Sequence, residues 1–190
     1  MRQALFLDRD GIVNVDKNHV WRIEDIEFID GVFDLGRVAR SHGLEIFIIT
    51  NQGGIARGKY SRADFDRLTR WMEARFQAEG CPTAATYHCP THPDFPNPLL
   101  DASHIGWRKP EPGMLFAAAY DHGIDLGRSF LVGDRASDVE AGARAGVGRI
   151  LLVGTAEAQP DRPVPQMDRV GSVRDSVAWL TALLSDRGRA

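Results

Sequence analysis

The stretch Ala4-Leu5-Phe6-Leu7-Asp8-Arg9-Asp10-Gly11 decides the fold. Its first four residues are a short apolar run that charged residues end abruptly, which predicts a buried strand. Side chains two residues apart on extended backbone point to the same side, so we expect Asp8 and Asp10 to share one face. The sequence therefore places two carboxylates directly after a buried strand. Taken alone, the pair is also compatible with a polar turn.

Predicted strands and helices alternate along the rest of the chain. Apolar side chains at helical spacing indicate amphipathic helices, and nearly continuous apolar runs indicate strands covered on both faces. This alternation predicts a three-layer, Rossmann-like α/β fold with a mainly parallel sheet and right-handed crossovers. We expect strands at 4–7, 44–50, 84–88, 130–133 and 149–153, helices at 32–42, between Ser61 and Gly80, after Pro112, at 136–145 and at 173–184, and a long loop at 89–111.

Polar residues follow three of the predicted strands. The first strand runs into Asp8, the second into Thr50-Asn51-Gln52-Gly53 and a later one into Gly133-Asp134. Ligands bind beyond the carboxyl ends of the strands in sheets of this kind. The topology is therefore expected to bring these segments together at one rim, although each segment alone is also compatible with an ordinary turn.

Three carboxylates, Asp8, Asp10 and Asp134, are expected at this rim. Three anions in one cleft repel one another and raise each other's pKa unless a cation lies between them. Oxygen ligands without a nearby thiolate favour Mg²⁺. Lys109 can supply a fixed positive charge, although a lone lysine is more often a solvated surface residue.

Length and composition narrow the class of protein. A chain of 190 residues, 43% hydrophobic and 26% charged, is predicted to be a single domain, 1–190, with a sizeable core. Its formal net charge of −3 disfavours a protein that mainly holds nucleic acid. Two cysteines, Cys81 and Cys89, make no disulfide framework, which favours the cytoplasm. We expect no membrane partner, since no apolar run approaches the ~20 residues of a membrane span and no secretory signal is recognisable.

Four segments in chain order resemble the motifs of the haloacid dehalogenase (HAD) superfamily of phosphatases: Phe6–Gly11, Thr50–Gln52, Arg108–Pro110 and Gly133–Asp134. The resemblance covers roughly residues 4–155. It implies a HAD fold without a large cap domain and with a loop insertion at about 89–107. It also implies that the partner is a small sugar phosphate and that the chain acts as a monomer.

The resemblance further implies a two-step phosphoryl transfer. Asp8 would attack phosphorus and form an aspartyl-phosphate, while Asp10 would protonate the leaving oxygen and then deprotonate water. Mg²⁺ would be held by Asp8, the Asp10 backbone carbonyl and Asp134. Lys109 would offset the charge of the transferring group. Asp138 either lies behind the metal ligands or is a helix-surface acid. The residues expected to grip the phosphoryl group or the rest of the substrate are Asp16, His19, Thr50, Asn51, Gln52, Gly53, Arg108 and Arg135.

Two longer runs, 51–58 and 108–114, resemble the heptose 1,7-bisphosphate 7-phosphatases and the related histidinol-phosphate phosphatases. A guanidinium can grip a second phosphate with two hydrogen bonds, so Arg108 favours a bisphosphate. We therefore expect removal of the 7-phosphate of D-glycero-D-manno-heptose 1,7-bisphosphate, a step toward lipopolysaccharide. The alternatives are a histidinol-phosphate phosphatase, a DNA 3′-phosphatase, which the acidic balance disfavours, and a non-catalytic protein that binds a phosphate ligand on the same scaffold.

The loop after the third strand departs from the family. Many members hold a structural zinc there with a Cys-x-His and a Cys-x-Cys pair, whereas this chain has Cys89-Pro90-Thr91-His92 and Ile105-Gly106-Trp107. Cys89, His92 and His104 offer three ligands, His88 is a poor candidate for a fourth, and structural zinc normally needs four. We therefore expect a loop without zinc that is packed by aromatic side chains and prolines.

Overall fold

The computed structural model describes residues 1–154, 160 and 162–187. In this part of the chain, six parallel strands form one sheet in the order β3-β2-β1-β4-β5-β6. The parallel α/β fold predicted from the sequence is confirmed. The strands are β1 (Ala4–Leu7), β2 (Glu45–Asn51), β3 (Thr83–Cys89), β4 (Phe130–Gly133), β5 (Arg149–Val153) and β6 (Met167–Val170).

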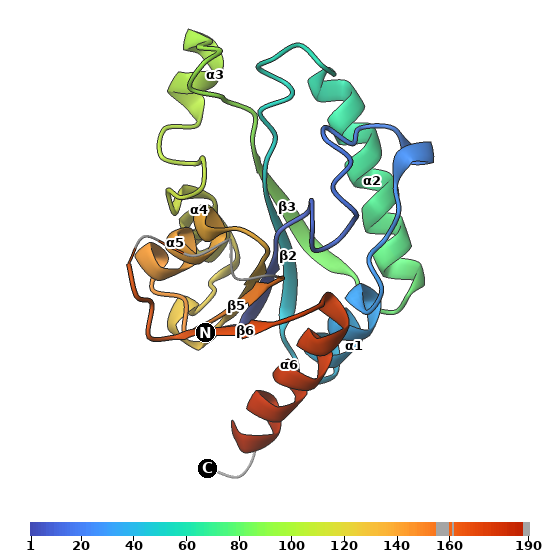
Figure 1. The fold of residues 1–190 in the computed structure, drawn as a ribbon, viewed down its shortest axis with the longest axis vertical. Helices are drawn as coiled ribbons and strands as arrows, with labels where there is room; N and C mark the ends of the chain where they lie inside the picture. Colours follow the sequence, from blue (N-terminus) through green and yellow to red (C-terminus); the bar gives the residue numbers. More distant parts are fainter. Residues whose placement is uncertain (155–159, 161, 188–190) are drawn as a thin grey trace.

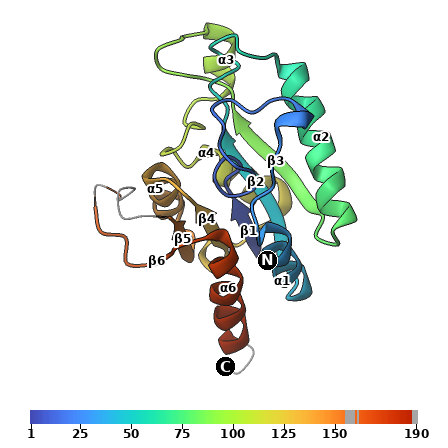
Figure 2. The same ribbon diagram turned by 45° about the vertical axis from the view of Figure 1, so that its right-hand side comes forward.

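Helices cover both faces of the sheet, so the fold has three layers (Figures 1 and 2). One face packs against α1, α2 and α6, and the other packs against α4 and α5. The helices are α1 (Val32–Ser41), α2 (Arg62–Ala78), α3 (Pro98–Ser103), α4 (Gly113–His122), α5 (Ala136–Ala145) and α6 (Val173–Arg187), with 3₁₀ turns at Ile23–Asp25 and Leu126–Arg128.

Strand β1 shows why its sequence requires a layer on each side. All four of its residues are fully buried. Leu5 and Leu7 join the core under α1, α2 and α6, while Ala4 and Phe6 join the core under α4 and α5. Successive side chains of a strand point to opposite faces, so a wholly apolar strand suits a sheet covered on both sides. Since β1 pairs with both β2 and β4, its carboxyl end opens in the middle of the sheet edge.

Two elements were not predicted from the sequence. Helix α3 forms inside the predicted loop at 89–111, where the Asn97 side chain accepts a hydrogen bond from the Leu100 backbone (3.4 Å) and Pro98 occupies the first helical position. Strand β6 is a half-exposed edge strand that carries Asp168 and Arg169. The sequence of a half-exposed edge strand such as β6 has only a weak apolar pattern, and a short helix such as α3 has none.

The segments that join β1 to α1 and β3 to α4 run past the carboxyl edge of the sheet (Figure 2). They span residues 8–31 and 90–112, and within the described residues neither forms a large cap domain, in agreement with the predicted fold class. No helix within residues 1–154 or 162–187 combines the length and apolarity needed to cross a membrane.

His88, near the end of β3, is a buried histidine of the core. Its ring stacks on Phe65 of α2 with ring centroids 4.2 Å apart, and its Nε2 atom has no hydrogen-bond partner among the described residues. Burial, assisted by the charge of Arg62, lowers the pKa of His88 to about 4. The folded protein therefore keeps this ring neutral in mildly acidic solution.

This burial predicts a pH-dependent stability. Above the unfolded pKa of 6.5 the ring is neutral in both states, and its contribution is fully present. Below pH 6.5 only the unfolded chain takes up the proton, so the free energy of unfolding falls by about 2.5 kcal/mol between pH 7.5 and 4.5. We expect His88→Leu to lose this part of the pH dependence in urea unfolding. Equal slopes in the two proteins would contradict the account.

Candidate active site

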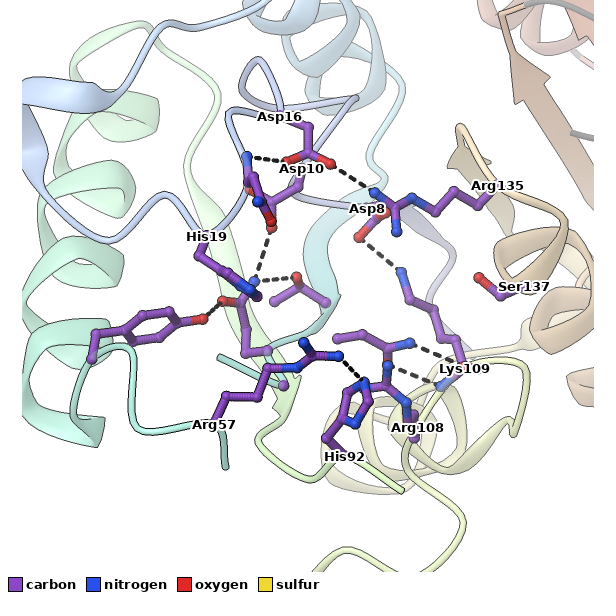
Figure 3. Close-up of a pocket in the computed structure, with 16 residues that line it drawn as sticks. Asp8, Asp10, Asp16, His19, Arg57, His92, Arg108, Lys109, Arg135 and Ser137 are labelled. Carbon is purple, nitrogen blue, oxygen red and sulfur yellow. Dashed lines mark hydrogen bonds and ion pairs between the residues drawn. The ribbon is translucent and has the colours of Figure 1, made fainter. Parts of the chain in front are cut away.

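A pocket of about 270 Å³ lies at the carboxyl ends of β1 and β2, between the segments that follow them (Figure 3). Its lining includes each of the four side chains predicted to be catalytic, namely Asp8, Asp10, Thr50 and Lys109. It also includes the seven predicted to bind substrate, namely Asp16, His19, Asn51, Gln52, Gly53, Arg108 and Arg135. The fold thus brings together residues that are up to 127 positions apart.

Lys109 lies at the centre of the buried charges. Its ammonium nitrogen is 2.8 Å from Asp8 Oδ1 and 2.5 Å from Asp138 Oδ1, and it donates to the Ile49 carbonyl at 3.0 Å. These partners match its three N–H groups. Burial alone lowers the pKa of Lys109, but the Asp138 and Asp8 carboxylates outweigh burial and raise it above its ordinary value. The lysine is therefore a permanent cation at the base of the pocket.

Asp138 is a buried member of the site, since only 1% of the residue is exposed. The alternative that it is a helix-surface acid is therefore wrong. One of its oxygens pairs with Lys109, and the other accepts a hydrogen bond from the Arg135 backbone (3.0 Å) at the start of α5. The position of Asp138 along α5 does not reveal in the sequence that it is buried, because its burial depends on contacts with a distant loop.

Three carboxylates, those of Asp8, Asp134 and Asp138, each offer an oxygen within 4.8 Å of the others. Among the described residues, this is the one group of three or more acidic, histidine or cysteine side chains close enough to share an ion. Oδ1 of Asp134 is buried and has no partner in the same part of the chain. A hard cation such as Mg²⁺ fits this oxygen set.

Burial and mutual repulsion raise the pKa values of two carboxyl groups in this acidic group. Burial, then the charge of Asp138, raises the pKa of Asp134 to about 6. Burial and Asp138 also raise the pKa of Asp8 above its ordinary value, although Lys109 acts in the opposite direction. A cation beside these carboxylates favours their ionised forms.

The Asp10 carboxylate points to a different set of partners. The buried Arg9 guanidinium binds both of its oxygens, with a shortest distance of 2.8 Å. Asn14 donates to Oδ1 and Gln52 donates to Oδ2, each at 3.0 Å. The two carboxylates of the Asp-x-Asp pair therefore have separate surroundings, one beside Lys109 and one beside Arg9.

Cationic side chains form the outer wall of the pocket (Figure 3). Arg108 donates to the Thr91 carbonyl at 3.0 Å, and Arg57 Nη2 lies 2.7 Å from His92 Nε2. Partial desolvation and the charges of Arg57 and Arg108 lower the pKa of His92, which suits a neutral ring that accepts from Arg57. Sequence reasoning did not select Arg57 or Tyr60 for the site, although Arg57 stands inside the 51–58 run.

The segment after Asp10 reaches over one side of the pocket. Asp16 pairs with Arg135 at 2.7 Å and accepts a hydrogen bond from the Asn18 backbone at 2.9 Å. Asn18 and His19 have positive φ angles of 61° and 70°, a conformation that non-glycine residues seldom adopt. This tight turn directs His19 toward the pocket (Figure 3).

Asn51 and Cys89 have specific local partners. The Asn51 side chain accepts from the Lys109 backbone N–H and donates to the Lys109 carbonyl, both at 3.0 Å. It therefore joins the end of β2 to the lysine segment. The Cys89 sulfur lies 3.2 Å from the Thr91 hydroxyl, at the start of the loop that departs from the family.

Gly11 lets the first segment pass close to the acidic group. Its φ is +95°, and a Cβ atom there would lie 2.1 Å from Asp134 Oδ2. Gly43 is a matched control, because its φ is +77° and a Cβ atom there would meet nothing within 4 Å.

We expect Gly11→Ala to weaken Mg²⁺ binding at least about tenfold, because Asp134 must move. Gly43→Ala carries only the cost of a left-handed residue, about 1 kcal/mol, and leaves Mg²⁺ binding unchanged. Isothermal titration with MgCl₂ and thermal unfolding separate the two effects. Equal Mg²⁺ affinities in the two variants would show that the acidic group does not hold the ion.

Comparisons with known proteins agree with this geometry. The family described as HAD-hydrolase-like matches residues 106–179. The chain is 43% identical to a D-glycero-α-D-manno-heptose-1,7-bisphosphate 7-phosphatase from Burkholderia mallei, over 98% of this chain and 97% of that protein. It is 41% identical to a D-glycero-β-D-manno-heptose-1,7-bisphosphate 7-phosphatase from Escherichia coli K12, over 81% of this chain and 80% of that one.

A solved structure is also similar. The D,D-heptose 1,7-bisphosphate phosphatase from B. bronchiseptica, complexed with magnesium and phosphate, superimposes with a TM-score of 0.80 and 26% identity. The match covers 95% of this chain and 99% of the other. On this similarity the chain is a phosphatase of the HAD superfamily and belongs to the family of the heptose-1,7-bisphosphate 7-phosphatases.

Proposed function

We propose that this phosphatase removes the 7-phosphate of D-glycero-D-manno-heptose 1,7-bisphosphate with Mg²⁺ and through a phosphorylated aspartate. The observation that carries the proposal is the separation of charge across one pocket. Asp8 and Lys109 form its base, next to the buried Asp134 and Asp138 carboxylates, and Arg57 and Arg108 form its outer wall. A substrate with two phosphates can place one at each end.

Asp8 is the proposed nucleophile. One of its carboxylate oxygens attacks phosphorus, and the bond between phosphorus and the sugar oxygen breaks. The Lys109 ammonium, 2.8 Å from Asp8, offsets negative charge on the transferring group. Asp8, Asp134 and the Asp10 backbone carbonyl would hold Mg²⁺, which when bound adds positive charge beside the phosphoryl oxygens.

Asp10 is the proposed acid and base. Its carboxyl group gives a proton to the leaving sugar oxygen, and the resulting carboxylate then takes a proton from water. That water attacks phosphorus of the aspartyl-phosphate, releases inorganic phosphate and restores Asp8. The Thr50 hydroxyl and the Asn51 amide are proposed to hold phosphoryl oxygens, with Gly53 allowing a close approach.

Arg108 is the proposed recognition residue for the second phosphate, together with Arg57. Partial burial lowers the pKa of Arg108, and among the described residues no carboxylate forms an ion pair with its guanidinium. A phosphate dianion supplies that missing partner. Asp16, His19 and Arg135 are proposed to contact the sugar hydroxyls from the opposite side of the pocket.

We also propose a monomer with a single domain, 1–190, as the sequence indicates. The cytoplasm is the proposed location, because two free cysteines suit a reducing compartment.

The proposal is tested by release of inorganic phosphate from both anomers of heptose 1,7-bisphosphate and from histidinol phosphate, with MgCl₂ or EDTA. We expect Mg²⁺-dependent turnover and a kcat/KM for one heptose anomer at least about 100-fold above that for histidinol phosphate. Equal rates on the sugar and on histidinol phosphate would overturn the substrate. No turnover of any phosphate ester would favour a non-catalytic binding protein.

We expect Arg108→Met to lower kcat/KM for heptose 1,7-bisphosphate by about 30- to 100-fold, the value of a charge-assisted contact. The same variant should lower kcat/KM for heptose 7-phosphate less than about threefold, since that substrate lacks the second phosphate. Arg70→Met, on the exposed face of α2, is the control. Equal losses on both substrates would place Arg108 at the reacting phosphate instead.

A further inference from the structure

Gln52 and Tyr60 line the pocket but perform no step of the proposed mechanism. The Gln52 side chain has three polar contacts. Its amide nitrogen donates to Asp10 Oδ2 at 3.0 Å and to Thr50 Oγ1 at 2.7 Å, and its amide oxygen accepts from the Tyr60 hydroxyl at 2.5 Å. With 2% of the residue exposed, Gln52 has no solvent alternative to these partners.

The partners of Gln52 fix the direction of each hydrogen bond that its side chain makes. In this structure both oxygens of the Asp10 carboxyl group act as acceptors, because the Arg9 guanidinium and the Asn14 amide donate to them. The Gln52 NH₂ group must therefore face Asp10, and its second N–H then reaches Thr50. The amide oxygen is left for Tyr60, whose hydroxyl must donate.

The same logic fixes the Thr50 hydroxyl. Its oxygen accepts from Gln52, so its own proton is free to donate elsewhere. Within the described part of the chain, the Thr50 side chain has no second hydrogen-bond partner, and it lines the pocket. The proton is therefore available to an oxygen of a bound phosphoryl group.

Packing keeps the Tyr60 hydroxyl on Gln52. The Tyr60 ring stacks on Trp21, with centroids 6.4 Å apart and planes inclined by 18°. On another side the ring approaches Gly54 so closely that a Cβ atom there would lie 2.3 Å from it. Burial raises the pKa of Tyr60 to about 12, so the hydroxyl retains the proton that it donates.

We propose that Tyr60, acting through Gln52, is a positioning residue for phosphoryl transfer. It orients the Gln52 amide, and this amide directs the Thr50 proton into the pocket and holds the Asp10 carboxylate. Without the Tyr60 hydroxyl the buried Gln52 amide oxygen has no donor, so the side chain is no longer held where its NH₂ group reaches Asp10 and Thr50. The inference rests on the proposed function, because Thr50 and Asp10 are assigned their roles there.

A double-mutant cycle tests the proposal with p-nitrophenyl phosphate as a simple ester. Tyr60→Phe removes one hydroxyl and keeps the ring; we expect kcat to fall about tenfold, the value of one hydrogen bond, with KM changed less than about twofold. Because Tyr60 acts through Gln52, adding Tyr60→Phe to Gln52→Ala should cause no further loss.

The control is Tyr87→Phe, which removes a different tyrosine hydroxyl, one that donates to the Asp121 carboxylate away from the pocket. It should leave kcat unchanged. Full activity of Tyr60→Phe would overturn the proposal, and so would independent losses that multiply in the double variant. Thermal unfolding of both variants checks that each is folded at the temperature of the assay.

A binding measurement separates this proposal from the proposed function. Inorganic phosphate is titrated into each variant with saturating MgCl₂, which requires no turnover. Orientation of the Thr50 hydroxyl by Gln52 predicts that Tyr60→Phe weakens phosphate several-fold on the wild-type background and not on Gln52→Ala. If phosphate binding follows this pattern but the wild-type protein turns over no phosphate ester, only the proposed function is contradicted. A wild-type protein that binds no phosphate would overturn both.

Discussion

The site depends on one buried ammonium group. Lys109 reaches Asp8 after β1, the Ile49 carbonyl of β2 and Asp138 of α5, so its three N–H groups join three elements at the base of the pocket. Burying a charge is costly unless partners replace its water, and removing one partner leaves the others uncompensated. The lysine therefore fixes the relative positions of the carboxylates as well as their charge. It also leaves one negative charge in excess between Asp8 and Asp138, which with Asp134 favours a cation.

The sheet order makes this arrangement available. Strand β1 lies between β2 and β4, so the residues that follow these three strands emerge side by side although they are far apart in sequence. The crevice at the carboxyl edge of a parallel sheet is the usual ligand site of such folds. Here the segment at 14–19 closes one side of it and the segment from Thr91 to Arg108 closes the other. The two sides differ in charge and in contacts, so they present different groups to a ligand that spans the pocket.

Much of this was readable from the sequence, because the decisive elements carry local signals. Strand β1 is wholly apolar and buried on both faces, and the polar residues after β1 and β2 line the pocket as a parallel sheet requires. Asp138, α3 and β6 show the limit. Asp138 is buried by a loop lysine 29 positions away, α3 is a short helix of six residues, and β6 is a half-exposed edge strand. Tyr60 was not among the site residues predicted from the sequence for a similar reason, since its proposed role depends on its contact with Gln52.

The central claim is that Asp8 itself carries the phosphoryl group during turnover. It is tested most directly by mixing the enzyme with Mg²⁺ and heptose 1,7-bisphosphate, stopping the reaction with acid within milliseconds, and mapping the peptides by mass spectrometry. The account predicts that the peptide containing Asp8 gains the mass of one phosphoryl group, and that this species forms and decays no more slowly than phosphate is released. Rapid release of phosphate with Asp8 unmodified at every time point, or a phosphoryl group on another residue, would contradict it.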